Sequence, residues 1–245
     1  MFRLMKLKPP HGWRPVAWEL AIVTLGVFVA LGAEQLVSNF HWQSEVRKSD
    51  RRIRDELGVN LVNAYERLAI NNCLEPRLAE LRDDLIKGEP MWTDNRARFA
   101  NDIYNPVFPP VYRTPNRPWP KNVWETALNG EILGHYRPER VAQFAALFDE
   151  ASSLQRSQSE ELDIAASLGD LAFTGPISAA ERRANLKLVA KLGALNARIV
   201  FQSRRILKDA GDAGLSPDPE HLKKNLEEQR RYRGNCVGGA AKPTG

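Results

Sequence analysis

One apolar run near the start of the chain, residues 17–37, divides the sequence into two kinds of helix-forming pattern. Inside it, residues 20–33 carry no charged side chain, and Glu19 and Glu34 stand just beyond their two ends. After Gln43, apolar residues recur every three or four positions between charged ones, as in water-soluble amphipathic helices. The pattern predicts one membrane-compatible helix that carries a helical domain of about 200 residues.

The uncharged run alone is shorter than the roughly 20 residues that cross a ~30 Å hydrocarbon core, so its flanks decide its role. Glu19 and Glu34 lie near the ends, where a carboxylate can reach the headgroups. Trp18 and Trp42 are separated by about 36 Å of helix at 1.5 Å per residue, which suits two aromatic interface anchors. We therefore expect a transmembrane helix over residues 15–40 with these four residues at the membrane interfaces.

A cleaved signal peptide is the alternative. Ala30-Leu31-Gly32 offers small residues at the spacing of a cleavage site, and the preceding segment is basic. Against cleavage, Glu19 opens the apolar run, and helix-forming sequence continues past Gly32 without a break. The residues favour a retained span, with residues 1–14 as a short cytoplasmic tail.

The compartment of the domain rests on two weaker signals. Lys and Arg lie on both sides of the span, so their distribution does not give its orientation. The two cysteines, Cys73 and Cys236, suit one disulfide in an oxidising compartment, and two unpaired thiols are an equal alternative. We expect the N-terminus in the cytoplasm and the C-terminal domain on the other side of the membrane.

The extramembrane domain, residues 41–233, is expected to be helical throughout except for one segment. Helical periodicity runs on from the span, and Asn71-Asn72 is expected to break it before a second helix over 74–86, closed by Gly88. Later helices are expected after Pro120, from Pro138 to about Leu168, from Ser178 to about Gly211, and from Pro219 to Arg233. The two longest should pair as an antiparallel hairpin.

Two details of these helices matter for the domain. The middle of the first long helix, Gln155 to Glu161, is polar and is expected to project or to face water. Ser178 and Glu181 have the spacing of a capping box at the start of the second. The fold class is therefore all-α, a transmembrane helix that continues into a helical bundle, followed by a flexible tail over residues 234–245.

Residues 91–119 differ in kind, because prolines cluster toward their end and alternate with aromatic residues. Proline fixes φ and removes a donor, which predicts an extended strap. Two interpretations stay open. The strap is either an ordered segment that packs its aromatics across the helices, or a recognition surface presented by Phe108, Tyr112 and Trp119.

No sequence motif for catalysis, phosphate binding or metal binding is visible. The four histidines lack carboxylate or cysteine partners at metal-ligand spacing; they are His11, His41, His135 and His221. The net charge of +5 is mild, and basic and aromatic residues form no nucleic-acid pattern. We expect no catalytic, cofactor or metal residues and no nucleic-acid partner.

Within the span, Glu19, Gly26, Ala30 and Ala33 fall on one helical stripe. Small residues four apart allow two membrane helices to approach closely, and a polar neighbour can add a hydrogen bond between them. The stripe is therefore a candidate surface for a homodimer. The alternative is that Gly and Ala are simply common in membrane helices.

Two stretches resemble a family of known layout. The segment ELAIVTLGVFVALGAEQLV, followed by a tryptophan and a charged helix, resembles the start of an uncharacterised bacterial family of single-pass membrane-anchored helical proteins. RPWPKNVWETALNGEI, residues 117–132, is similar to a recurring stretch in proteobacterial members. The resemblance implies a single-pass inner-membrane protein and carries over no catalytic residue.

These observations favour a membrane-anchored interaction or scaffold protein, whose partners are the lipid bilayer and a membrane or periplasmic protein. The anchor would act by confining the domain near those partners. One alternative is a ligand-sensing helical domain that signals through a membrane partner. Another is an enzyme of unrecognised type.

Overall fold

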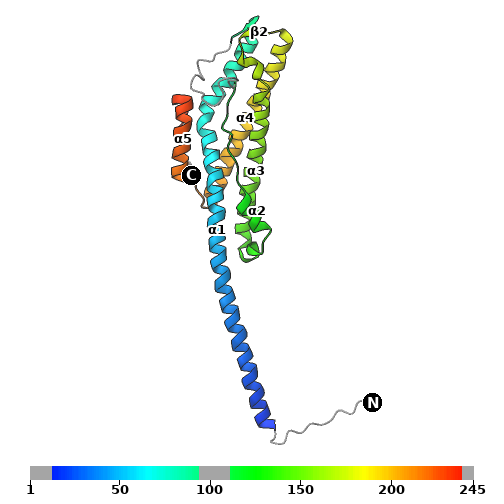
Figure 1. Ribbon diagram of the computed structural model, residues 1–245, viewed down its shortest axis with the longest axis vertical. Helices are drawn as coiled ribbons and strands as arrows, with labels where there is room; N and C mark the ends of the chain where they lie inside the picture. The colour runs from blue at the N-terminus through cyan, green and yellow to red at the C-terminus, as the bar shows by residue number, and fades with distance from the viewer. Residues whose placement is uncertain (1–12, 94–110, 239–245) are drawn as a thin grey trace, which may run out of the picture.

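The computed structural model describes residues 13–93 and 111–238 and is mostly helical, which confirms the all-α character (Figure 1). The helices are α1 (Trp13–Lys87), α2 (Asn122–Leu128), α3 (Pro138–Ala166), α4 (Ala179–Asp212) and α5 (Pro219–Arg233). Short 3-10 helices are η2 (Ile132–His135), η3 (Gly169–Ala172) and η4 (Gly234–Cys236). Two-residue strands β1 (Met91–Trp92) and β2 (Gly175–Pro176) pair antiparallel.

The central element is α1, one unbroken helix of 75 residues. The predicted break at Asn71-Asn72 is therefore wrong. The Asn71 amide, which could otherwise favour a turn, accepts a hydrogen bond from Asn196 at 2.9 Å and donates to Glu75 at 3.3 Å. Ile70 and Leu74 on either side are fully or almost fully buried. Packing on one face thus outweighs the weak local preference of asparagine for turns.

The end of α1 follows the prediction. The helix passes through Pro76, which removes one backbone donor without ending it, and stops at Lys87. Gly88 then adopts a φ of 78°, a left-handed conformation that costs glycine little.

The other helices pack around the second half of α1. Helix α4 contacts both α1 and α3, and α5 contacts α1 (Figure 1). Side chains later in α4 meet side chains earlier in α3: Arg198 contacts Glu160, and Gln202 contacts Ser157. In Figure 1 the first part of α1 extends alone from one end of this assembly.

Two clusters of buried apolar side chains hold the helices together. The cluster nearer the free part of α1 joins α1 to α2, α3 and α4 and includes Ile53, Leu57, Trp124, Phe144, Phe148, Leu154, Ile199 and Ile206. The other joins α1 to α4, α5 and the segments around β1 and η3, and includes Ile70, Leu74, Leu81, Trp92, Leu168, Leu192, Leu222 and Leu226. Stacking of Trp124 on Phe148, with ring centroids 5.4 Å apart, contributes to the first cluster.

The polar middle of α3 faces water on one side, as predicted, but its other side is buried. Gln155, Arg156, Ser159 and Glu160 are exposed, whereas Ser157 and Glu161 are only 3% and 1% exposed. The physical reason is that their polar atoms find partners inside the domain, which offsets the cost of removing them from water. Ser157 donates to Gln202, and Glu161 accepts from Arg67.

Helix boundaries set by local signals agree with the sequence. Ser178 and Glu181 form both hydrogen bonds of a capping box at the start of α4. Helix α5 begins at Pro219, with the Asp218 side chain accepting from the backbone N–H of His221. Both helices therefore start where a side chain satisfies a free backbone donor.

The C-terminal segment is corrected at its start. Residues 234–238 were expected to belong to a flexible tail, but η4 forms here and Cys236 is disulfide-bonded to Cys73 of α1. The backbone N–H of Gly238 also donates to the carbonyl of Ala69 at 2.8 Å. Residues 239–245 lie outside the described residues.

We expect the double variant Cys73→Ser/Cys236→Ser to lose about 3–5 kcal/mol of unfolding free energy. The bond closes a loop with a sequence separation of 163, and constraining so long a loop lowers the entropy of the unfolded chain. Urea unfolding of the full-length protein in detergent measures the effect. Reduced wild type should unfold at the same urea concentration as the double variant. Equal unfolding free energies of oxidised wild type and the variant would contradict the prediction.

Candidate functional site

A layer of buried polar side chains lies between the two apolar clusters. Its centre is Arg67 of α1, whose Nη2 donates to Glu161 Oε1 of α3 at 2.5 Å and to Asn196 Oδ1 of α4 at 2.7 Å. The hydroxyl of Tyr112 donates to the same Glu161 oxygen at 3.1 Å. All four residues are less than 9% exposed. The layer therefore ties three long helices to the segment that carries Tyr112.

A second group of polar contacts continues the layer toward α5. Glu66, which is 1% exposed, accepts two hydrogen bonds from Arg117, both at 2.9 Å. It also accepts from Gln229 of α5 at 2.8 Å. Gln229 in turn accepts from Arg233, whose other nitrogen donates to the carbonyl of Arg113 at 2.7 Å. Neighbouring residues of α1, Glu66 and Arg67, thus serve two different groups of contacts, about 100° apart around the helix.

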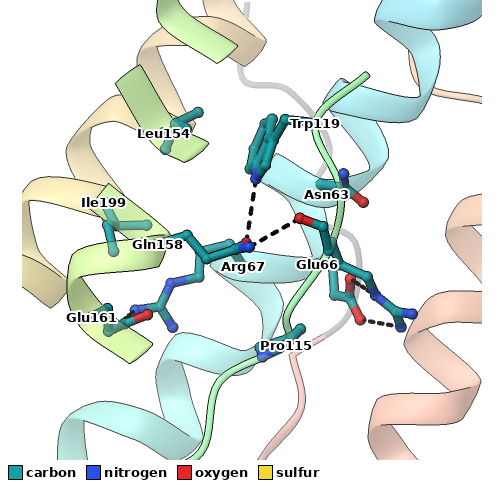
Figure 2. Close-up of a pocket in the computed structure, with 10 residues that line it drawn as sticks. Asn63, Glu66, Arg67, Pro115, Trp119, Leu154, Gln158, Glu161 and Ile199 are labelled. Carbon is teal, nitrogen blue, oxygen red and sulfur yellow. Dashed lines mark hydrogen bonds and ion pairs between the residues drawn. The ribbon is translucent and has the colours of Figure 1, made fainter. Parts of the chain in front are cut away.

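A small hollow opens between these two groups (Figure 2). Figure 2 shows Arg67 and Glu161 on one side of it and Glu66 on the other, with Trp119 and Gln158 between them. The hollow has a volume of about 10 Å³, room for about one water molecule. Small-molecule sites usually measure about 300–1,000 Å³. Its size therefore suits hydration of the polar layer and does not suit a substrate or a sensed metabolite.

Burial dominates the electrostatics of the layer. It raises the pKa of the Glu161 carboxyl, and the neighbouring Arg67 charge and Tyr112 hydroxyl oppose that rise. Burial and the nearby Glu161 charge also raise the pKa of the Tyr112 hydroxyl. The pKa of Arg233 is lowered to about 10 by burial and by the charges of Arg113 and Arg67. Each shift opposes the charged form, as expected for groups removed from water.

The segment at residues 111–121 forms no helix or strand and packs its aromatic side chains inward. Tyr112 is 2% exposed, and Trp119 is 7% exposed, with its indole N–H donating to Gln158 at 3.3 Å. The hypothesis that these two residues present a recognition surface is therefore wrong, because neither ring is accessible to a partner. Phe108 lies outside the described residues.

The four residues predicted to lie at the membrane interfaces are all on the first half of α1. Trp18 is 70% exposed, Glu19 and Glu34 are exposed, and Trp42 is half-buried. Among the described residues, α1 is the one helix long and apolar enough to cross a membrane, by length and composition, and its apolar stretch is not buried. The structure thus brings Trp42 into contact with the domain and leaves the other three on a bare helix.

The histidines and the small-residue stripe of the span are the remaining candidates from the sequence. Within the described residues, no three His, Cys, Asp or Glu side chains are grouped to hold a metal ion. His135 stacks on Trp42 with ring centroids 3.8 Å apart, and His221 lies 3.6 Å from Asp218 across one helix turn. Gly26, on the small-residue stripe, has no atom within 4 Å of an added Cβ, so the stripe is unpartnered in a single chain.

Comparisons with models of protein families, with curated proteins and with solved structures found no match to this chain. The resemblance to a bacterial family stays a prediction.

The polar layer can position helices, but its charges neutralise one another. Arg67 faces Glu161, and Arg117 faces Glu66 and Glu228 at 2.9 Å. Sequence reasoning missed the layer because Arg67 and Glu161 are 94 positions apart. The available signal was a charged residue at a position where the periodicity of each helix demands burial.

We expect Arg67→Met to cost about 3–5 kcal/mol of unfolding free energy, because it leaves the Glu161 carboxylate buried without its cation. The double variant Arg67→Met/Glu161→Leu should recover most of this loss, since neither charge is then buried. Urea unfolding of the four members of this double-mutant cycle gives the coupling energy.

The matched control for this cycle is the neighbouring pair Glu160 and Arg198, which is more than half exposed and 2.6 Å apart. Its cycle should give less than about 1 kcal/mol. Similar coupling energies for the two pairs would show that burial does not set the strength of the Arg67–Glu161 interaction.

We expect Glu161 to make the stability of the domain fall as pH rises from about its ordinary pKa of 4.5. Because the folded-state pKa is raised, the unfolded chain releases this proton first, so folding binds more protons in that interval. Glu161→Gln should remove this part of the pH dependence, whereas Glu160→Gln should retain it. Urea midpoints across the pH range measure both; parallel curves for wild type and Glu161→Gln would contradict the assignment.

Proposed function

We propose that the protein is a single-pass membrane-anchored scaffold that holds a rigid helical bundle at a fixed height beside the membrane, where it contacts a membrane or periplasmic protein. The observation that carries the proposal is the continuity of α1. Its apolar first part is fully exposed, and its second part is the central helix of the domain.

Exposure of the first part supports an anchor. Thirteen large apolar side chains between Val16 and Phe40 are at least 41% exposed. Burying such a side chain is worth about 1.5–3 kcal/mol, so covering the whole stretch is worth on the order of 20 kcal/mol or more. That exceeds the usual stability of a folded domain, about 5–15 kcal/mol. A soluble core helix would be buried here, so a lipid environment is the better match.

The continuity of α1 makes the proposed scaffold stiff. No glycine- or proline-rich linker separates the span from the domain, and the helix passes through residues 40–50 without interruption. From Trp42 to Lys87 it rises about 68 Å at 1.5 Å per residue. The domain therefore extends away from the membrane as a stiff body, which we call the post, and its far end lies at the last turn of α1 and the β1–β2 pair. The anchor raises the local concentration of the post near membrane partners.

The disulfide supports a periplasmic domain. Cys73 and Cys236 are bonded and belong to the extramembrane part of the chain. Disulfides persist in oxidising compartments and are rare in the cytosol. With the domain outside, residues 1–14 form the cytoplasmic tail and the chain lies in the inner membrane of a bacterium.

The contact surface is reassigned from the buried aromatic segment to the far end of the post. Ile86, Met91 and Phe173 are 63%, 52% and 43% exposed there, beside the β1–β2 pair. Exposed apolar side chains grouped at one end are typical of protein interfaces. A ligand-sensing function finds less support, because the hollow in the polar layer holds about one water molecule.

We expect the full-length protein to stay in the membrane pellet after alkaline carbonate extraction and to keep the mass of the uncleaved chain. The double variant Leu25→Arg/Val29→Arg should shift toward the soluble fraction, because each charge near the centre of a span costs about 2.5–3.5 kcal/mol. Phe201→Arg, a change at an equally exposed apolar site on α4, should stay in the pellet.

Protease added to spheroplasts supplies the orientation. Digestion of the domain places it in the periplasm, and full protection would reverse the proposed topology. Release of the wild-type chain by carbonate, or a mature N-terminus beyond Gly32, would overturn the anchor itself.

A further inference from the structure

The end of the domain nearest the free part of α1 is built by the chain that follows α2. Helix α2 starts beside Glu56 of α1, whose carboxylate accepts from the backbone N–H groups of Val123 and Trp124 at 2.9 and 3.0 Å. Further along, the Tyr136 hydroxyl donates to the carbonyl of Val46 at 3.2 Å. The segment thus descends α1, and Figure 1 shows it as the lowest part of the domain.

The lowest contact of this segment is a ring stack. His135 of η2 lies on Trp42 of α1, with centroids 3.8 Å apart and planes at 15°. Trp42 lies about 36 Å along the helix from Trp18, a separation that places the two rings at opposite membrane interfaces. A residue stacked on Trp42 is therefore held at headgroup level.

We define residues 128–135 as the foot of the domain. Leu128 is 53% exposed, and Gly130, Gly134 and His135 are also exposed. None of these four residues belongs to the polar layer or to the apolar clusters. The foot thus carries an exposed leucine and, seven residues later, the histidine that stacks on Trp42. Apolar area together with polar rings is the composition favoured where hydrocarbon meets headgroups.

Basic side chains follow Trp42 and the foot along the chain. Arg137 is exposed immediately after the foot, and Arg47 and Arg51 are exposed five and nine residues after Trp42, on the side of α1 away from the ring stack. Within the part of the chain that the structure describes, these three residues make no ion pair with a carboxylate. Lipid phosphates carry the complementary charge and attract basic residues near the membrane surface.

We propose that the foot rests in the phospholipid headgroup layer on the domain's side of the membrane. The inference rests on the proposed anchoring by α1 and adds a second point of attachment. A span alone leaves the domain free to tilt and to rotate about the helix axis. A second contact at the same membrane surface limits this tilt and fixes which face of the domain is turned toward the membrane.

Position-specific fluorescence quenching tests the proposal on the full-length protein in vesicles of phosphatidylethanolamine and phosphatidylglycerol. Single cysteines are introduced by Leu128→Cys in the foot, Val29→Cys in the span and Phe201→Cys on α4, and each is labelled with bimane. The native cysteines are disulfide-bonded and do not react. All three sites are more than half exposed, so the substitutions leave the apolar clusters intact.

The quenchers are two nitroxide lipids, one labelled on the headgroup and one in the middle of the acyl chain. The label at position 128 should be quenched by the headgroup nitroxide at least about threefold more than the label at position 201. The label at position 29 should respond to the acyl-chain nitroxide. Phe201 lies about 18 Å along α4 from Ala213, which contacts Arg140 above the foot, so its label should respond to neither.

The outcomes separate the two proposals. Quenching at position 29 with position 128 behaving like position 201 would overturn the foot and leave the anchor standing. Absence of acyl-chain quenching at position 29 would overturn the anchor and the foot together. Quenching at position 128 by the acyl-chain nitroxide alone would also overturn a headgroup position.

Discussion

The structure depends on a single helix, α1, whose two parts need different environments. The first part of α1 offers apolar side chains on every side, whereas the second part offers a face to each of α3, α4 and α5 and buries its charged side chains only where they are paired. A helix that is apolar all round needs an apolar environment, and an amphipathic helix needs packed neighbours. Because both parts belong to one continuous helix, the environment of the first part determines where the second part stands.

The polar layer determines how far each helix is shifted along its neighbours. Apolar clusters alone tolerate sliding of one helix past another, since leucine and isoleucine pack acceptably against many neighbours. A slide of one turn, about 5.4 Å, would separate the buried Glu161 carboxylate from Arg67 and leave it without its cation. The buried ion pair adds little net stability compared with an apolar pair, but it makes the shifted arrangements costly.

Local signals in the sequence were sufficient for much of the fold. The capping box at Ser178, the proline that opens α5 and the glycine that ends α1 act within a few residues, so their effects can be predicted without tertiary structure. The predictions of a helix break at Asn71-Asn72 and of a fully exposed middle of α3 missed buried contacts for one shared reason. Each polar side chain found its partner on another helix, and the identity of that partner is invisible until the helices are packed.

The candidate site shows the same limit, and helix α5 illustrates its consequence. Helix α5 is mostly charged and buries only Leu222, Leu226 and Gln229, so apolar contact alone gives it little hold on α1. Glu66 supplies a polar attachment through Gln229, and the disulfide at Cys73 attaches the chain just beyond the helix. Both attachment points are on α1, about two helical turns apart. A weakly apolar helix is thus retained by two specific links, which explains why its highly charged sequence forms part of a folded domain.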